Sequence, residues 1–114
     1  MRYVMKRSQI VAVLGERAAD DLKAASDADM IELRLDLATE PIQTIKAIRE
    51  ATEKAIIATN RLQAEGGKFQ GSERERIELL VQASEYADLV DIELQAELRE
   101  EFISQVSRPV IVSY

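Results

Sequence analysis

The fold is decided by one stretch of the sequence, Met30-Ile31-Glu32-Leu33-Arg34-Leu35-Asp36-Leu37, in which apolar and charged side chains alternate. A period of two predicts a β-strand, because successive side chains of a strand point to opposite faces of the sheet. All the charges fall on one of these faces. Taken alone, the stretch is typical of an antiparallel strand whose polar face lies in water.

Four further segments have the length and composition of strands: Ile10–Leu14, Lys54–Arg61, Leu89–Leu94 and Pro109–Tyr114. The first of them is apolar throughout, which predicts a strand buried on both faces. A helix is predicted between each consecutive pair of strands, from helix propensity, helix-start signals and the spacing of apolar residues. The first helix covers Glu16–Ser26, and the second begins at Pro41 and buries Ile42, Ile45 and Ile48. The third begins at the capping box Ser72–Glu75 and carries Ile77, Leu80, Val81 and Ser84 on one face. The fourth runs along Leu98, Phe102 and Val106.

Strands that alternate with helices predict a parallel sheet joined by right-handed crossovers, with helices on its outside. The charged face of residues 30–37 then has to line an interior, where charges need partners or a ligand. Polar residues also recur on later strands, at Thr59, Arg61, Asp91 and Glu93. This inward polar ring favours a (β/α)8 barrel over an open doubly wound sheet, whose strands stay apolar along their length. No glycine-rich phosphate loop follows any strand, which also disfavours a nucleotide-binding fold.

The predicted fold class is therefore α/β, of the (β/α)8 TIM-barrel type, with residues 1–114 forming a single domain of five parallel strands and four helices. A complete barrel has eight strands and about 250 residues. The sequence also ends on a hydrophobic strand, and an uncovered strand edge is a pairing hazard. We therefore expect the 114 residues to be the N-terminal part of a barrel, truncated after Tyr114.

The composition excludes several kinds of site. Cysteine and histidine are both absent, so the chain has no disulfide, no thiolate nucleophile and neither the commonest general base nor the commonest metal ligand. We expect no metal and no cofactor. A net charge of −6 disfavours binding to nucleic acid or to an anionic membrane, despite a short basic lead at Met1–Ser8. No apolar run approaches the roughly 18 residues that span a membrane, and the cytoplasm is the default location.

Four short motifs occur in a fixed order: Glu32-Leu33-Arg34-Leu35-Asp36, then Thr59-Asn60-Arg61 with Glu65-Gly66-Gly67 shortly after, then Val90-Asp91-Ile92-Glu93-Leu94, then Ser113-Tyr114. In order and spacing they resemble type I 3-dehydroquinate dehydratase, the shikimate-pathway enzyme that converts 3-dehydroquinate to 3-dehydroshikimate. The similarity runs from about Ile10 to Tyr114, and the short loops resemble archaeal or thermophilic members of the family.

The resemblance implies roles for five residues. Glu32, Arg34 and Arg61 match positions that bind the substrate, and a guanidinium suits a carboxylate because its fork can donate two parallel hydrogen bonds. Glu65 matches a carboxylate that orients the catalytic histidine, and Asp91 matches an acid that supports the site. A polar substrate contact of some members would fall near Val13, so we assign no role to the first strand.

The same resemblance implies that the two central catalytic groups lie outside this chain. In the family a histidine follows the Ser-Tyr motif directly, and a lysine on a later strand forms a Schiff base with the substrate ketone. Neither is present here, so the 114 residues alone are expected to be inactive, although the whole enzyme is expected to be a homodimer acting on 3-dehydroquinate. Lys54 and Lys68 match neither role and are expected to be surface lysines.

Two alternatives stay open at the level of sequence. Arg34 between Glu32 and Asp36 could form a purely structural ion-pair ladder. The chain could also be an inactive half barrel that serves as a structural module, pairing with a second copy or with a complementary half. The sequence that follows Tyr114 would distinguish this module from the dehydratase.

Overall fold

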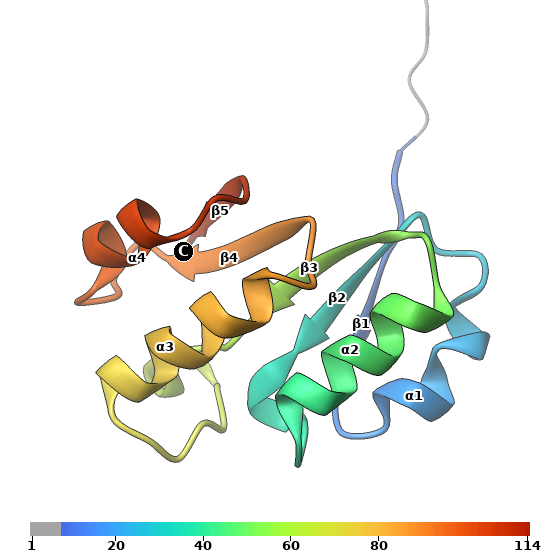
Figure 1. Cartoon of the computed structure of the whole chain (residues 1–114), viewed down its shortest axis with the longest axis horizontal. Coiled ribbons are helices and arrows are strands. Elements are labelled where there is room, and N and C mark those ends of the chain that lie inside the picture. The colour runs from blue at the N-terminus through green and yellow to red at the C-terminus, as the bar shows by residue number, and fades with distance from the viewer. Residues whose placement is uncertain (1–7) are drawn as a thin grey trace, which may run out of the picture.

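The structure, a computed structural model, describes residues 8–114, so the basic lead expected at Met1–Ser8 lies outside the described residues except for Ser8. The described part consists of strands that alternate with helices (Figure 1). The strands are β1 (Val11–Leu14), β2 (Met30–Arg34), β3 (Ala55–Thr59), β4 (Leu89–Glu93) and β5 (Val110–Ser113). The α-helices are α1 (Ala18–Asp21), α2 (Pro41–Ala51), α3 (Glu73–Ser84) and α4 (Arg99–Gln105), and short 3-10 helices cover Lys23–Ala25, Leu35–Leu37 and Gln63–Glu65.

The five strands are parallel, and their order across the sheet is their order along the chain. Because every crossover steps in the same direction and such crossovers are right-handed, the helices fall on one face of the sheet. Figure 1 shows α1, α2 and α3 in front of the strands. A doubly wound sheet instead reverses its order and carries helices on both faces. The prediction of five parallel strands and four α-helices in a barrel-type arrangement is confirmed.

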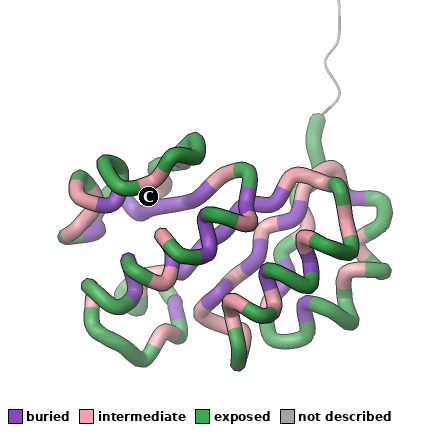
Figure 2. Tube along the Cα trace, viewed as in Figure 1, coloured by how far each residue is buried: buried purple, intermediate pink, exposed green. Residues whose placement is uncertain are grey.

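The core lies between the sheet and these helices (Figure 2). Every second strand residue points into it, as the alternation of apolar residues predicts. The largest contributors from the strands are Ile31, Leu33, Ile56, Val90 and Ile92, and those from the helices are Ile45, Ile48, Leu80 and Phe102. None of the helices within residues 8–114 is both long enough and apolar enough to cross a membrane.

The capping box at the start of α3 is confirmed in both of its hydrogen bonds. The backbone N–H of Glu75 donates to Ser72 Oγ at 3.1 Å, and the backbone N–H of Ser72 donates to Glu75 Oε1 at 3.0 Å. Two orphan donors of the first turn are thereby satisfied. The first turn of α3 is therefore held in place, and with it the side chains that α3 directs toward the sheet.

All five strands are shorter than predicted, and so is the first helix. The strand expected over Met30–Leu37 ends at Arg34, and the next three residues form a 3-10 turn. The helix expected over Glu16–Ser26 is one turn of α-helix followed by a 3-10 turn, and no side chain caps its start. The N–H groups of Asp29 and Met30 both donate to the carbonyl of Ile10. The connection between β1 and β2 therefore has to end beside the start of β1.

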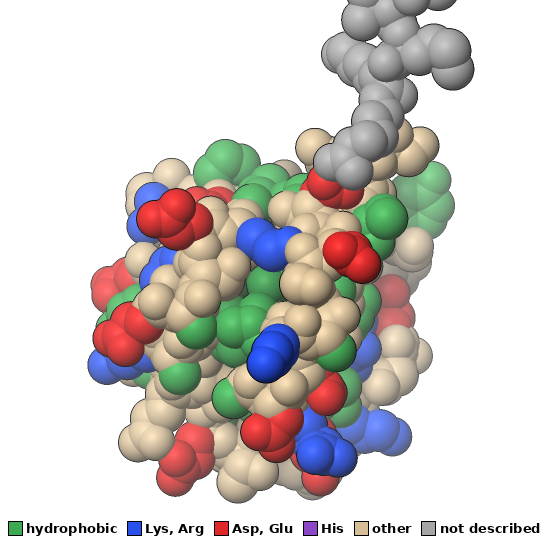
Figure 3. Space-filling view, turned by 90° about the vertical axis from the view of Figure 1, so that its right-hand side faces the viewer, with side chains coloured by type: hydrophobic (Ala, Val, Ile, Leu, Met, Phe, Trp, Pro, Cys, Tyr) green, Lys and Arg blue, Asp and Glu red, His purple; other side chains and the backbone are tan. Residues whose placement is uncertain are grey.

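The prediction that the first strand is buried on both faces is wrong. Val11 is 41% exposed and Val13 is 57% exposed. The two residues pair in register with Met30 and Glu32 of β2, whose side chains lie on the face opposite the helices, and β1 lies at the edge of the sheet. Figure 3 looks onto the end of the molecule where the chain enters β1 and shows hydrophobic surface between charged side chains. An edge strand of an unclosed sheet has no neighbour to bury its inner face.

Lys54, predicted to be a surface lysine, is partly buried, and its ammonium group is held by backbone carbonyls. Lys54 Nζ donates to the carbonyl of Ser26 at 2.6 Å and to that of Ala28, and lies 3.5 Å from the carbonyl of Ala25. These carbonyls belong to the turn that leads into β2. Lys54 therefore ties the amino-terminal end of β3 to that turn, whereas Lys68 is exposed as predicted.

Candidate active site

The register of the sheet brings the polar residues of four strands to one side. Arg34 pairs with Thr59, and Thr59 pairs with Asp91. One step later along the strands, Glu93 pairs with Ser113. Because these positions alternate with the core residues, their side chains lie on the face opposite the helices, at the carboxyl ends of the strands. This is the end at which parallel α/β folds carry their sites.

Arg61, two residues after the end of β3, is the centre of this group. Its Nη1 atom donates to Asp91 Oδ1 at 2.9 Å, to Glu93 Oε2 at 2.8 Å and to Ser113 Oγ at 3.2 Å. Its Nη2 atom lies 3.9 Å from Glu32 Oε2, beyond hydrogen-bond distance. Burial opposes the charge, but the carboxylates outweigh it and raise the pKa of Arg61, so the side chain stays cationic.

Glu32 and Asp91 belong to the same group of polar side chains around Arg61. Thr59 Oγ1 donates to Glu32 Oε2 at 2.7 Å, and Ser113 Oγ donates to Asp91 Oδ1 at 2.7 Å. Both hydroxyls therefore orient carboxylates that also face Arg61. The structure brings three of the five predicted site residues, Glu32, Arg61 and Asp91, into one cluster.

Arg34 lies beside this cluster and is engaged by Asp36. Its Nε and Nη2 atoms donate to the two carboxylate oxygens at 2.9 and 2.7 Å, a bidentate pair. The hydrogen bond to Asp36 raises the pKa of Arg34, and the Arg34 side chain is 21% exposed. The ion pair considered from the sequence exists, but with Asp36 alone rather than as a ladder that includes Glu32.

Asp36 also organises the loop that carries Arg61. Its carboxylate accepts hydrogen bonds from the backbone N–H of Arg61 at 3.3 Å and of Lys68 at 3.0 Å. Burial works against the ionised carboxyl, but the hydrogen bonds from Arg34 and from these two amides hold the pKa of Asp36 below its ordinary value. Its side chain is fully buried.

Glu65 lies apart from the cluster. It ends the 3-10 turn that follows Arg61, and it is exposed. It lines a cavity of about 380 Å3 together with Leu62, Gln95 and Tyr114. Within the described residues no hydrogen bond or ion pair joins Glu65 to the cluster, and Glu65 shares this cavity with Tyr114, the residue that the expected histidine would follow.

The sequence analysis missed three residues of the site, Asp36, Glu93 and Arg76. Glu93 was noted as polar but was given no role, yet its side chain is 1% exposed and binds Arg61, Arg76 and the backbone N–H of Leu62. Arg76 lies in α3 and is 4% exposed. A signal was available, because Arg76 precedes Leu80 by four residues and so shares the buried face of the helix.

The chemistry of the cluster is that of a polar binding site with an excess of acid. Four carboxylates, from Glu32, Asp36, Asp91 and Glu93, accompany the guanidinium groups of Arg34 and Arg61. Among residues 8–114, no group of three or more acidic, histidine or cysteine side chains is arranged to hold a metal ion. The cluster can orient hydroxyls and a carboxylate, but it contains no lysine, no cysteine and no histidine.

Comparisons with known proteins agree on one family. The sequence model of type I 3-dehydroquinase matches residues 10–114. The 3-dehydroquinate dehydratase of Methanothrix thermoacetophila is 43% identical over 113 residues, covering 96% of this chain and 49% of the relative. That of Methanobrevibacter smithii is 40% identical, covering 91% of this chain and 50% of the relative. The chain thus spans about half the length of these archaeal relatives.

Solved structures are similar over the same extent. The 3-dehydroquinate dehydratase of Enterococcus faecalis superposes with a TM-score of 0.76 at 25% identity, covering 91% of this chain and 52% of that structure. The dehydroquinate dehydratase and shikimate dehydrogenase of S. pombe gives a TM-score of 0.81 at 27% identity and is covered to 25%. The five strands and four helices described here correspond to part of these TIM-barrel proteins.

Proposed function

This chain belongs to the type I 3-dehydroquinase family, and we propose that the protein to which it contributes dehydrates 3-dehydroquinate to 3-dehydroshikimate. In this proposal the 114 residues supply the substrate-binding part of a (β/α)8 barrel. Glu32, Arg34 and Arg61 bind the substrate, and Glu65 and Asp91 support the catalytic groups. We further propose a cytoplasmic location, the default for a chain of this composition.

The geometry of Arg61 carries the proposal. Its Nη1 atom is anchored by Asp91, Glu93 and Ser113, while no acceptor within residues 8–114 binds Nη2. The guanidinium group is therefore oriented on one side and available on the other, which suits a substrate carboxylate. Glu32 is arranged in the same way: Oε2 accepts from Thr59, and no donor of the described residues binds Oε1, which is available to a substrate hydroxyl.

The chemical step needs groups that this chain does not contain. We propose that a lysine elsewhere in the barrel condenses with the substrate ketone, releasing water and forming an imine that stabilises the carbanion. A histidine then removes the adjacent proton, the neighbouring hydroxyl leaves as water, and hydrolysis of the imine releases the product. The chain has no histidine, and Lys54 is bound by carbonyls at the amino-terminal end of β3. The excess of carboxylates in the cluster suits an added lysine cation and would oppose an anionic substrate without one.

The test compares residues 1–114 alone with the same residues joined to the C-terminal half of the Methanothrix thermoacetophila relative. The product is a conjugated enone carboxylate, so ultraviolet absorbance measures its formation. We expect no turnover by the 114 residues, and metal-independent turnover by the joined protein that borohydride abolishes in the presence of substrate. Turnover by the 114 residues alone would contradict the assigned roles of the histidine and lysine, and insensitivity to borohydride would contradict the imine.

A substitution in the joined protein tests Arg61. Arg61→Ala is expected to raise KM and to lower kcat/KM by the equivalent of about 2–5 kcal/mol, the cost of losing a charge-assisted contact. Arg74→Ala removes an exposed guanidinium of α3 and is the matched control, expected to leave both constants unchanged. If Arg61→Ala lowered only stability and left the kinetics of the folded enzyme intact, Arg61 would be a structural residue.

The exposed apolar side chains of the edge strands favour a second candidate function, a self-associating half barrel without activity of its own. Val11 and Val13 of β1 and Ile111 and Val112 of β5 are 37–57% exposed. Apolar edges of this kind pair with other chains. We propose a homodimer on the same grounds.

A further inference from the structure

Arg76 reaches from the outer helix layer into the charged cluster, which is unusual for a residue in the first part of a helix. It is the fourth residue of α3, close to the helix N-terminus, where the helix dipole disfavours a cation. Its side chain is 4% exposed. A buried cation at this position needs strong compensation, and the hydrogen bonds of Arg76 show where that compensation comes from.

The guanidinium of Arg76 binds two carboxylates and one carbonyl. Its Nε and Nη2 atoms donate to Glu73 at 2.8 and 3.0 Å. Its Nη1 atom donates to Glu93 Oε1 at 3.0 Å and to the carbonyl of Asn60 at 2.6 Å. Arg76 therefore contacts both the carboxylate that holds Arg61 and the backbone residue that precedes Arg61.

Glu93 joins the two arginines. Oε1 accepts from Arg76, while Oε2 accepts from Arg61 Nη1 at 2.8 Å and from the backbone N–H of Leu62 at 2.9 Å. Both carboxylate oxygens are thus committed, and the side chain is 1% exposed. If one donor to this buried carboxylate were lost, the ionised form of Glu93 would become costly.

The charges around Arg61 explain why a second cation is needed. Asp91 Oδ1 and Glu93 Oε2 both bind the same Arg61 nitrogen, so they lie within about 6 Å of each other, a distance at which like charges disfavour ionisation. Glu32 approaches the same guanidinium group from β2. Arg61 alone would therefore face three carboxylates, and Arg76 is the other cation that contacts this group, through Glu93.

We propose that Arg76 is a positioning residue for Arg61, which acts by keeping Glu93 ionised and fixed in place. This inference deepens the proposed function, since Arg61 is the residue proposed there to bind the substrate carboxylate. With Arg76 in place, Glu93 holds Arg61 Nη1 and the Leu62 amide, so that Nη2 points to the site. Without Arg76, Glu93 takes up a proton at a higher pH than with Arg76 present, and it then releases one of these donors. In this proposal, the orientation of Arg61 depends on α3, a helix of the outer layer.

The direction of the pKa of Glu93 is consistent with this role. Burial would raise it, but the hydrogen bond from the Leu62 amide and the charges of Arg76 and Arg61 together hold it below its ordinary value. The charged groups that face Glu93 are Arg61 after β3, Arg76 and Glu73 on α3, and Asp91 on β4 itself. Removing Arg76 leaves two acids and only one cation among these neighbours.

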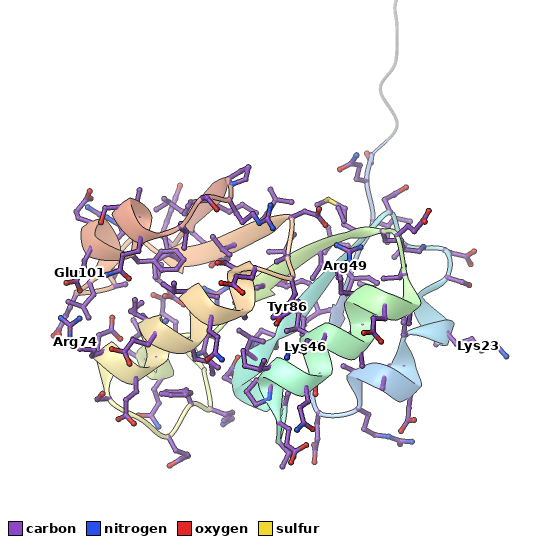
Figure 4. The ribbon with its side chains drawn as sticks, in the orientation of Figure 1. Lys23, Lys46, Arg49, Arg74, Tyr86 and Glu101 are labelled. Atoms are coloured by element: carbon purple, nitrogen blue, oxygen red, sulfur yellow. The ribbon has the colours of Figure 1, made fainter. Side chains whose placement is uncertain are left out.

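The first test follows the side-chain carboxyl carbon of Glu93 by NMR while the 114-residue chain is titrated, and it requires no turnover. Arg76→Met is expected to raise the pKa of Glu93 by about 1–3 pH units, the usual effect of losing a nearby opposite charge. Arg76→Lys is expected to restore most of the difference. Arg74→Met is the matched control, because Arg74 lies on the same helix but pairs with Glu101 at the outer side of the molecule, as Figure 4 shows. A folded Arg76→Met variant with an unchanged Glu93 titration would overturn the proposal.

A second measurement needs no substitution, so it holds even if Arg76→Met does not fold. In the unsubstituted chain, the guanidinium resonances of Arg61 are expected to shift and to exchange faster as Glu93 becomes protonated at acid pH. Arg61 resonances that do not change while Glu93 titrates would show that Glu93 does not hold Arg61, and would overturn the proposal that Arg76 positions Arg61 through Glu93.

A kinetic test in the joined protein separates positioning from a merely structural role. Below the new pKa of Glu93, Arg76→Met is expected to raise KM about 10–100-fold, the equivalent of one charge-assisted hydrogen bond, with little change in kcat. KM should fall again as the pH rises above the new pKa of Glu93. A pH-independent KM would contradict the proposal, whereas inactivity of every joined protein would refute the proposed function and leave the NMR result standing.

Discussion

Asp36 illustrates how one side chain just beyond a strand can organise a site. The sequence predicts Asp36 on the charged face of a strand, but in the structure it lies in the 3-10 turn that follows β2. From there it binds the guanidinium of Arg34 and the backbone amides of Arg61 and Lys68. Two of the substrate-binding candidates therefore depend on an acid that the sequence analysis did not place among the site residues.

Asp36→Asn is expected to lower the free energy of unfolding at neutral pH by about 1–3 kcal/mol, the cost of leaving buried donors with a poorer acceptor. The pKa of Asp36 is lower in the folded state than its ordinary value of 3.8. The stabilisation by the carboxylate is therefore complete above pH 3.8 and is lost as the pH falls through the folded pKa. The difference between the two proteins should shrink below that pH.

Urea unfolding of both proteins at several pH values measures this difference. Asp20→Asn is the control, because the Asp20 side chain is 73% exposed and its loss should change stability by less than about 0.5 kcal/mol. A stability difference for Asp36→Asn that stayed constant down to strongly acid pH would show that the charge of Asp36 is not what stabilises the loop.

At the scale of elements, the loop between β3 and α3 depends on two glycines with different roles. Gly66 has a φ of 93°, a left-handed conformation that favours glycine, but a Cβ there would meet no atom within 4 Å. A Cβ on Gly67 would lie 1.8 Å from the carbonyl oxygen of Arg61. The close approach at Gly67 thus folds the loop back onto the residue that holds the centre of the site.

Gly67→Ala is expected to destabilise the protein by about 1–3 kcal/mol and to displace Arg61, because the clash is with backbone that cannot rotate away. Gly66→Ala should cost about 1–2 kcal/mol through its backbone conformation and leave Arg61 in place. Denaturant unfolding measures both costs, and the Arg61 side-chain NMR signals report its position. Equal effects of the two substitutions on those signals would contradict the distinction.

At the scale of the whole molecule, the sheet is open at both edges. The inner residues Val13 and Ile111 are 57% and 37% exposed, and Val112, on the helix-facing side of β5, is 44% exposed. Figure 2 shows exposed backbone along β5, in contrast to the buried central strands. In the Enterococcus faecalis structure, this part corresponds to about half of the chain.

The isolated chain is expected to self-associate, most simply as a two-fold pair, because apolar strand edges bind one another. Sedimentation equilibrium at micromolar concentration measures the association. Val13→Lys should weaken it, whereas Ala51→Lys adds the same charge to the exposed end of α2 and should not. A well-folded monomer with a sharp two-state unfolding transition would show that the half barrel can close its own core.

Local patterns were enough to predict the type and order of the elements. The alternation at residues 30–34, the apolar stripe of α2 and the capping box of α3 each depend on neighbours within a few residues, so they can be read from the chain itself. Parallel pairing then follows from the strand–helix alternation. The inward face with Glu32, Arg61 and Asp91 was predicted for the same reason, although the roles of these residues come from the family resemblance.

Only the tertiary structure decided which charges meet. Arg34 pairs with Asp36 rather than with Glu32, Arg61 gathers Asp91 and Glu93 from a strand 30 residues later, and Arg76 enters from the helix layer. The carbonyls that hold Lys54 lie 26–29 residues away, and the burial of Val13 was predicted wrongly because Val13 lies on an edge that no strand covers. Such contacts depend on register, on crossover direction and on which face is closed. These are properties of the assembled sheet, so a local pattern can show that a side chain such as Arg76 faces the core but not which charges it meets.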